Sequence, residues 1–469
     1  MMNKLASLPF FRSSHENPLI NHDPSDPRSC LVKTKCGHVF ALENITNSFN
    51  EKKLEDRRCS RCKKLALPLK VLEGCPDKNN PYCLSPALEA AGKGDIKTLK
   101  LLLDCNPDVA KAIYHNPPHK NEITLLHAAA SHGQVSAVKL LLEYGATPNS
   151  RTSTCLDTPL INAVLNGHHQ VIDLLAKYEN ETPVNFPDHF FDDWYLPPLI
   201  FARDIKSAQI LVNHKADVNA RAYTPGWIQE HNMTPLLIAA RDDNASLVEF
   251  LVQHGADVNA AIFNNATKNG LTPLSTQNGN AYIVECPLQN GAYVDAAMDC
   301  ATDNYDATPL LIASRRGHTQ VVSILLKYGA NVNVMVHAEN ERGLTPLIAA
   351  ATHGCHKTVQ LLLKNNADAN AVVTGKDLEG CSALWLAACN GHHKIVELLL
   401  KYKADPHVID KKGRSAYDAA IKEKHHKIAK LLKEHGATTN TPKNQTSVKS
   451  ASGEQKPLIP DVNNPHTDV

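Results

Sequence analysis

Four residues near the start of the chain have the types and the spacing of a zinc site. Cys36 and His38 form one close pair, and Cys59 and Cys62 form a second pair after 20 intervening residues. Cysteine thiolates and histidine nitrogens are the usual ligands of tetrahedral structural zinc. The pattern therefore predicts one structural zinc ion bound by these four side chains.

The remaining cysteines indicate the compartment in which the chain folds. Six of the 13 cysteines lie between Cys30 and Cys83, and the other seven are scattered singly. The opening run MMNKLASLPFFRSSHE lacks the apolar core of a signal peptide, so we expect a reducing, cytoplasmic compartment, where clustered cysteines more often bind metal. Cys30, Cys75 and Cys83, with His22, either form a second metal site or, as we favour, are buried thiols.

The sequence around the predicted zinc ligands resembles a degenerate RING domain. In the RING family four pairs of ligands hold two zinc ions; here only the second and fourth pairs are present, because Ala41 and Asn44 occupy the third. The runs DPRSCLVKTKCGHVFALENI and CSRCKKLAL are similar to the U-box pattern. The resemblance implies a small α+β domain over residues 16–80, of the U-box or single-zinc SP-RING type, behind a flexible segment 1–15. Its small core would be Val32, Val39, Phe40, Leu42 and Ile45.

A RING or U-box domain docks an E2 conjugating enzyme and supplies no nucleophile of its own. Carried over by position, the resemblance assigns the docking contact to Leu19 or Ile20 and a cation that steadies ubiquitin to Lys63. Ser60 stands where the family has a proline in the docking groove. The resemblance thus implies an E3 ubiquitin ligase, and the alternative is a non-catalytic adaptor whose zinc module is a structural cap.

Most of the remaining chain is one unit repeated about ten times. The fragments DTPLINAVLNGHH, MTPLLIAARDDN, ATPLLIASRRGH and LTPLIAAATHGC recur, followed in most cases by an apolar LL run and a variant of GADVN. Successive units start 33 to 39 residues apart, which is the spacing of a short helical repeat. The starts are Ser85, Thr124, Thr158, Pro197, Thr234, Thr272, Thr308, Thr345, Ser382 and Ser415.

The residues of one unit predict two helices and a turn. Thr345 can cap a helix whose first residue is Pro346, and Gly354 ends that helix before a second one begins near Lys357. One such pair cannot bury its apolar face alone, so the units must stack. The unit resembles the ankyrin repeat over residues 85–437, which implies a mainly α solenoid. The resemblance also makes three histidines structural rather than ligands: His168, His318 and His392.

Two departures from the repeat predict irregular structure. The unit over residues 270–295 is two residues short and places Pro287 where a helix interior is expected, so we predict a kink or loosened packing there. The segments 181–198 and 221–232 lengthen two fingers between units and carry exposed aromatic residues. These side chains either fold back onto the stack or form a patch that binds a partner protein: Phe190, Phe191, Trp194, Tyr195 and Trp227.

Composition and missing motifs exclude several classes of function. A net charge of +1 without a basic stripe argues against nucleic-acid binding, and the apolar runs are too short for a membrane span. The chain has no P-loop, G-x-S-x-G, H-E-x-x-H or G-x-G-x-x-G motif, so we expect the repeats to hold a substrate protein on their concave face and fingers. Residues 438–469 predict a disordered tail whose final TDV fits a PDZ ligand. This architecture would also suit a bacterial effector in a host cytosol.

Overall fold

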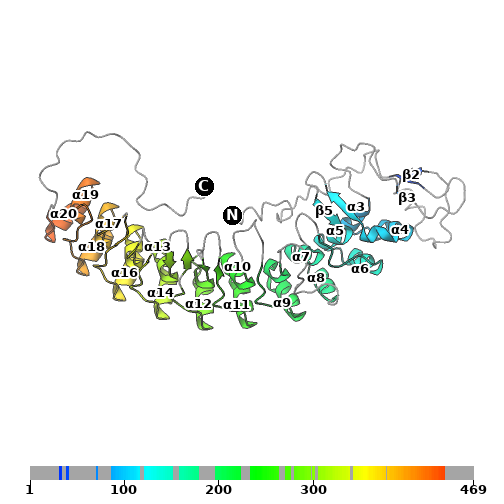
Figure 1. Cartoon of the computed structure of the whole chain (residues 1–469), viewed down its shortest axis with the longest axis horizontal. Helices are drawn as coiled ribbons and strands as arrows, with labels where there is room; N and C mark the ends of the chain where they lie inside the picture. The colour runs from blue at the N-terminus through cyan, green and yellow to red at the C-terminus, as the bar shows by residue number, and fades with distance from the viewer. Residues whose placement is uncertain are drawn as a thin grey trace.

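The computed structural model describes a helical array and three short strands of the preceding segment. The described residues are 31–33, 39–41, 70–71, 86–116, 121–151, 158–178, 196–222, 233–263, 270–275, 279–296, 298–300, 305–337, 342–376 and 378–438. The helices from α3 to α20 form one curved row (Figure 1). The predicted mainly helical solenoid is therefore confirmed.

Ten units follow one another in the row, and each consists of two helical segments. The first segments are α3 (Pro86–Lys93), α5 (Leu125–Ser131), α7 (Pro159–Leu165), η3 (Pro198–Phe201), α10 (Pro235–Arg241), η4 (Pro273–Ser275), α13 (Pro309–Arg316), α15 (Pro346–Thr352), α17 (Ala383–Cys389) and α19 (Ala416–Lys422). The second segments are α4 (Ile96–Cys105), α6 (Val135–Glu143), α8 (His169–Ala176), α9 (Ile205–Asn213), α11 (Ala245–Gln253), α12 (Ala281–Gln289), α14 (Thr319–Lys327), α16 (His356–Lys364), α18 (His393–Lys401) and α20 (His426–Glu434).

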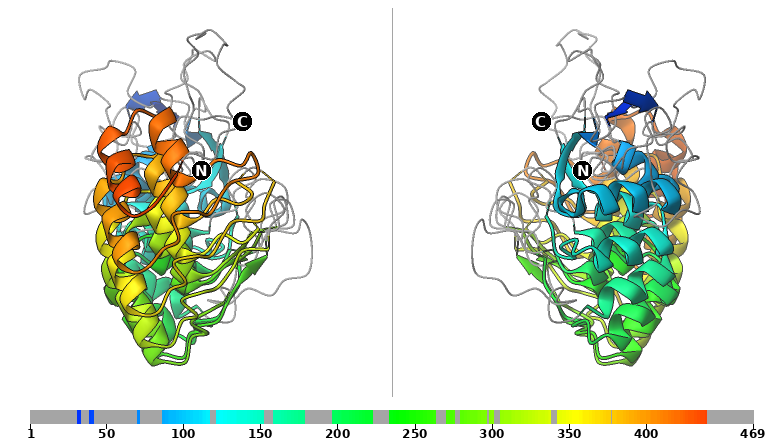
Figure 2. Two further views of the ribbon diagram at one scale, coloured as in Figure 1. Left: turned by 90° about the vertical axis from the view of Figure 1, so that its left-hand side faces the viewer. Right: turned by 90° about the vertical axis from the view of Figure 1, so that its right-hand side faces the viewer.

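The two sets of segments form two layers. The first segments pack on one another along the row, and the second segments do the same. The first layer lies on the inner side of the curve and the second on the outer side (Figure 1). The connections between units project to one side of the helices when the array is seen from its ends (Figure 2). Three of these fingers contain paired strands: β4 (Ile113–Asn116) with β5 (Asn121–Thr124), β6 (Ile262–Phe263) with β7 (Gly270–Leu271), and β8 (Met298–Cys300) with β9 (Tyr305–Ala307).

A threonine or serine caps the first helix of units two, three, five and seven to ten. The hydroxyl oxygens of Thr158, Thr234 and Thr345 accept hydrogen bonds of 3.2 to 3.3 Å from the backbone N–H three residues later. The proline that follows costs nothing at this position, because the N–H it lacks would have no partner within the helix. The second helix of a unit ends at a residue of positive φ, such as Gly255 at +87° or Gly329 at +86°.

The histidine just before the second helix of a unit, which follows a glycine in units three, seven and nine, joins neighbouring units. Nε2 of His168 donates to the carbonyl of Ser131 in the preceding unit (2.9 Å), and His425 does the same to Cys389 (3.1 Å). Each ring fills the space beside a glycine of the preceding unit, and a Cβ on Gly133 would lie 2.6 Å from Nδ1 of His168. Burial also lowers the pKa of His168. The predicted structural role is confirmed for three histidines: His168, His318 and His392.

Asparagines in the turns after the second helices form another ladder between units. Oδ1 of Asn219 accepts the N–H of Asp257 (2.7 Å), and its Nδ2 donates to the carbonyl of Gly255 (3.1 Å). Asn259 and Asn333 make the same two contacts one unit and three units further along the array. Each asparagine therefore ties its turn to the next unit through both ends of its amide.

Unit six, which the sequence analysis placed over residues 270–295, differs from its neighbours in three ways. Over the described residues its first segment is the three-residue turn η4. Asp295 replaces the turn asparagine, so its carboxylate accepts the N–H of Asn331 (3.1 Å) and cannot donate in return. The apolar core also divides here, because Ile283 of α12 belongs to the core of the earlier units and Val284 to that of the later ones.

The kink or loosened packing predicted at Pro287 stays a prediction. Helix α12 runs without interruption over Ala281–Gln289, and Pro287 lies in its last turn. Pro287 and its neighbours Cys286 and Leu288 are buried. A proline this close to the end of a helix removes one hydrogen-bond donor without breaking several turns.

Unit four is shortened as well, and the repeat alignment did not predict it. Pro197 lies 18 residues before the turn residue Lys215 (215 − 197), whereas Thr234 lies 21 residues before Gly255 (255 − 234). The four-residue turn η3 stands in place of the first helix. The inner layer therefore has two short segments, one on each side of the complete unit five.

Candidate protein-binding site

Two long fingers leave the array from adjacent units and share one apolar base. The first finger ends at Leu196, and the second lies between Ala222 and Met233, whose backbones form an antiparallel bridge (Ala222 N to Met233 O, 2.8 Å). Ala222 and Met233 pack with Ile200 and Leu237 in a small cluster separate from the main core, and Leu196 lies against it. The two fingers therefore start side by side on the inner layer.

The aromatic residues predicted to bind a partner all belong to these two fingers. Tyr195 directly precedes Leu196, and Trp227 is five residues from Ala222, so the shared base brings the attachment points of both groups together. Their role as a binding patch stays a prediction. The aromatic side chains themselves lie outside the residues that the structure describes: Phe190, Phe191, Trp194, Tyr195 and Trp227.

Two histidine–aspartate pairs fix the shortened unit four against unit three. His169 on α8 bonds Asp204 at the start of α9 (2.9 Å), and His214 after α9 bonds back to Asp173 on α8 (3.0 Å). Burial would raise the pKa of Asp204, but hydrogen bonds from Ser207 and His169 hold that pKa below its ordinary value. These pairs connect the two units where a full first helix is missing, and so position the base of the first finger.

The same side chains are not arranged for catalysis. A nucleophilic serine needs a histidine that accepts the proton of its hydroxyl. Here the Asp204 carboxylate lies between Ser207 and His169, and it accepts hydrogen bonds from Oγ of Ser207 (2.6 Å) and from Nε2 of His169. No cluster of metal-binding side chains is found among the described residues, and no helix there is long and apolar enough to cross a membrane. Burial raises the pKa of the free thiols in this part of the chain, which keeps them protonated: Cys286, Cys355, Cys381 (to about 12) and Cys389.

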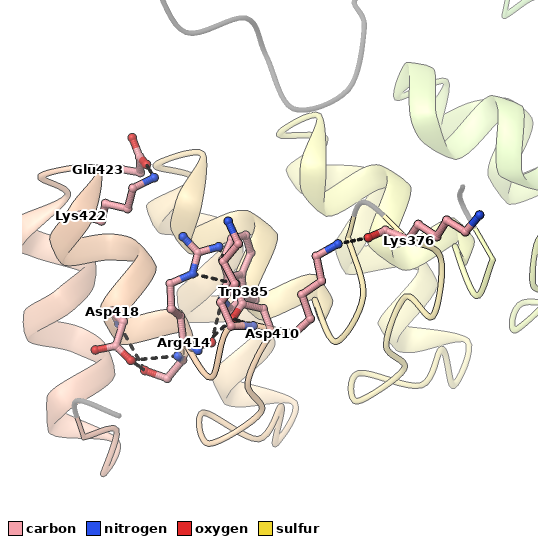
Figure 3. Close-up of polar contacts among 10 residues, drawn as sticks. Lys376, Trp385, Asp410, Arg414, Asp418, Lys422 and Glu423 are labelled. Atoms are coloured by element: carbon pink, nitrogen blue, oxygen red, sulfur yellow. Dashed lines mark hydrogen bonds and ion pairs between the residues drawn. The ribbon is translucent and has the colours of Figure 1, made fainter. Parts of the chain in front are cut away.

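The last finger of the array is held by a buried ion pair (Figure 3). Burial would raise the pKa of Asp410, but its hydrogen bonds with Arg414, including Nε at 2.8 Å, keep that pKa low. The Arg414 guanidinium lies 5.4 Å from the ring centre of Trp385 on α17, and the carbonyl of Arg414 accepts the indole N–H (3.0 Å). Nζ of Lys411 donates to the carbonyl of Lys376 in the finger before it. These contacts fix the shape of the inner surface at this end.

A pair of cations on the inner layer was missed by the sequence reasoning. Arg315 and Arg316 end α13, and both are only partly exposed. Burial, and then the neighbouring Arg315, lower the pKa of Arg316, although a guanidinium of this kind stays charged at neutral pH. Two adjacent positive charges attract carboxylates of a partner protein. The signal was Ser-Arg-Arg at the position where unit eight has Ala-Thr-His.

The structure describes three strands of the predicted zinc domain. β1 (Leu31–Lys33), β2 (Val39–Ala41) and β3 (Lys70–Val71) form an antiparallel sheet in the order β2-β1-β3. Two zinc candidates, Cys36 and His38, lie in the sequence between the paired strands β1 and β2. The zinc and E2 candidates lie outside the described residues and stay predictions: Cys36, His38, Cys59 and Cys62 for zinc, and Leu19, Ile20, Ser60 and Lys63 for the E2.

Comparison with known proteins identifies the repeat. A family model described as ankyrin repeats in three copies matches residues 63–152, 87–188, 274–373 and 371–443, and a single ankyrin-repeat model matches 231–262. Together these matches cover more than half of the 469 residues. The chain belongs to the ankyrin-repeat family, and its array is a protein-interaction surface.

Several known proteins are similar to parts of the chain. The putative ankyrin repeat protein FPV014 of fowlpox virus is 29% identical over 164 residues, which are 33% of this chain and 34% of that protein. The E3 ubiquitin-protein ligase XBAT33 of Arabidopsis thaliana is 42% identical over 91 residues, 19% of this chain and 17% of the ligase. The ankyrin repeat protein nuc-2 of Neurospora crassa is 26% identical over 255 residues, 53% of this chain and 21% of that protein. The chain thus spans about a third or less of the length of these relatives.

Proposed function

We propose that this chain is an E3 ubiquitin ligase whose N-terminal RING/U-box-like module binds zinc and recruits an E2, while the ankyrin array holds the substrate protein. The proposal depends mainly on one observation: Cys36/His38 and Cys59/Cys62 have the spacing of zinc ligands and lie among the apolar residues of a U-box pattern. The pairing of β1 with β2 around the first of these pairs supports it. The similarity to the Arabidopsis ligase XBAT33 also supports it.

In this proposal the ankyrin array binds the substrate protein. The two fingers that share an apolar base would present their aromatic residues to it, and Arg315 and Arg316 would add positive charge on the same layer. Aromatic and arginine side chains contribute most of the binding energy at protein interfaces. The substrate is therefore expected to bring an apolar segment with acidic residues beside it.

A non-catalytic adaptor is the second candidate function. The matched ankyrin repeats begin at residue 63, inside the segment 16–80 assigned to the zinc domain, and Ser60 replaces the proline of the E2 groove. In an adaptor the zinc module would only cap the first repeat, and no E2 would bind. The two functions share the zinc ion and differ in the E2 contact.

Zinc content tests the premise that both functions share. Elemental analysis of the full chain should give one zinc per chain, and Cys59→Ser should lose it, because removal of one of four ligands abolishes tight tetrahedral binding. Cys83→Ser is the matched control and should keep the zinc. Two zinc ions per chain would instead assign Cys30, Cys75 and Cys83 to a second site.

An autoubiquitination assay with a broad E2 panel then separates ligase from adaptor. Ile20→Ala should weaken E2 binding by about 1 to 3 kcal/mol, as expected when a central apolar contact is lost. Lys63→Ala should slow discharge of the E2 without weakening its binding, because its contact is to ubiquitin, and the neighbouring Lys64→Ala should change neither. If the zinc-loaded wild type neither binds nor discharges any member of the panel, the chain is an adaptor.

A further inference from the structure

The outer layer of the array carries its charge unevenly. The seven helices from α4 to α14 in this layer hold five lysines and five carboxylates, so their formal charges cancel. The last three helices, α16, α18 and α20, hold seven lysines and two glutamates, a net charge of +5. The excess positive charge of the outer layer is therefore confined to units eight, nine and ten.

Three of these lysines form one row across the three helices, and three more lie further along the same helices. Lys357 and Lys364 are seven residues apart on α16, which is about two turns and about 10 Å, so both lie on one side of the helix. Helices α16, α18 and α20 pack side by side, and packed helices lie about 8 to 10 Å apart. We call this surface the lysine face. It consists of the row Lys357, Lys394 and Lys427, each the second residue of its helix, and of Lys364, Lys401 and Lys430. Lys364 and Lys401 end their helices at the position where α20 has Glu434, and Lys430 lies one turn earlier on α20.

The charges of the lysine face are available to a partner. All six lysine side chains are exposed. Within the described ranges only Lys430 of the six forms an ion pair, with Glu434 at 3.9 Å. A stable partner of the lysine face must therefore carry negative charge across a width of roughly two interhelix distances.

We propose that the lysine face docks the array onto an anionic lipid leaflet. The lysine face lies on the outer, convex side of the curve (Figure 1). A convex surface fits a flat membrane better than it fits a nucleic-acid duplex or an extended peptide, which would need a groove. A leaflet presents mobile negative headgroups, which gather beneath point charges without any fixed geometry, and clustered lysines near its surface each strengthen binding. This role is independent of the ligase proposal, because it concerns only the outer layer of the last three units.

The composition of the face favours lipid over other polyanions. The helices α16, α18 and α20 contain no arginine and no phenylalanine, tyrosine or tryptophan. Lysines also contact nucleic-acid phosphates, but nucleic-acid surfaces add arginine forks to base edges or aromatic side chains that stack against bases, and these helices have neither. A specific acidic peptide would need groups that bind its backbone, whereas lysine is a flexible point charge. Diffuse attraction to a charged plane needs neither.

Vesicle sedimentation with the full chain tests the proposal. The wild type should bind vesicles of phosphatidylcholine with 30% phosphatidylserine and should not bind vesicles of pure phosphatidylcholine. The binding should disappear at high salt, where the Debye length falls to about 3 Å. The triple variant Lys357→Gln, Lys394→Gln, Lys427→Gln should bind about 100-fold more weakly, since each lysine near an anionic leaflet adds about fivefold in affinity. Circular dichroism should be unchanged, because all three positions are exposed.

A matched triple variant at the other end of the outer layer controls for net charge. Lys97→Gln, Lys100→Gln, Lys139→Gln removes three exposed lysines from α4 and α6 and should leave vesicle binding within about twofold of the wild type. Equal loss in both variants would mean that net charge alone drives binding and would overturn the assignment to the lysine face. Binding of the wild type to heparin or polyglutamate but not to the anionic vesicles would overturn the lipid in favour of a soluble polyanion. Absence of binding to any of them would overturn the proposal altogether.

Discussion

Asp295→Asn should strengthen the junction between units six and seven. Asn219, Asn259 and Asn333 occupy the same turn position in other units, and each donates its Nδ2 to a carbonyl of the next unit at 3.1 to 3.3 Å. Asp295 makes only the accepting half of this contact. An asparagine there would supply a donor to the carbonyl of Gly329, which ends α14 as Gly255 ends α11.

The magnitude follows from the kind of hydrogen bond that is gained. A neutral hydrogen bond adds about 0.5 to 1.5 kcal/mol to stability. The turn is exposed, and the new amide accepts less strongly than the carboxylate it replaces, so we expect a gain of about 0.5 to 1 kcal/mol. In a repeat array this gain belongs to one interface between units, and it couples the two sides of that interface more tightly.

Urea unfolding followed by far-ultraviolet circular dichroism measures the effect. Because the apolar core divides at α12, we expect the wild type to unfold in two steps, and Asp295→Asn should bring the two midpoints closer together. The mirror variant Asn259→Asp creates the same defect one unit earlier and should lower stability by a similar amount. If Asn259→Asp changes neither midpoint, the ladder contributes nothing to stability and the expected gain at Asp295 has no basis.

Three further predictions concern contacts between units. Asp204→Asn should destabilise unit four at neutral pH. Because the folded pKa of Asp204 is depressed, the difference from wild type should begin to shrink as the pH falls through the ordinary aspartate pKa of about 3.9 and should vanish only below the folded pKa; a difference that does not shrink as the pH falls through this range in thermal melts would contradict this. Gly391→Ala should lower the free energy of unfolding in urea by more than about 1 kcal/mol, since the φ of Gly391 is +80° and a Cβ would lie 2.7 Å from the ring of His425. Gly413→Ala, where a Cβ would have nothing within 4 Å, should lower it by less. Trp385→Phe should cost about 1 kcal/mol by losing its indole hydrogen bond to a backbone carbonyl of the last finger, and an unchanged midpoint would show that ring packing alone holds this finger.

The contiguous repeat determined most of the fold on its own. The signals that begin and end each helix are local: the capping threonine, the proline after it and the glycine in the left-handed conformation. The sequence of each unit therefore determines where its helices begin and end. The recurring period then requires the units to stack, because one helix pair cannot bury its apolar face. The zinc pattern at Cys36, His38, Cys59 and Cys62 is also local, and it remains a prediction of the sequence.

Only the tertiary structure decided which residues of different units meet. The sequence did not predict that unit four loses its first helix, that two fingers share the cluster around Ala222 and Met233, or that His169 and His214 tie α8 to α9. The two histidine–aspartate contacts join residues 35 and 41 positions apart, and their geometry is set by the stacking of whole units rather than by any local propensity.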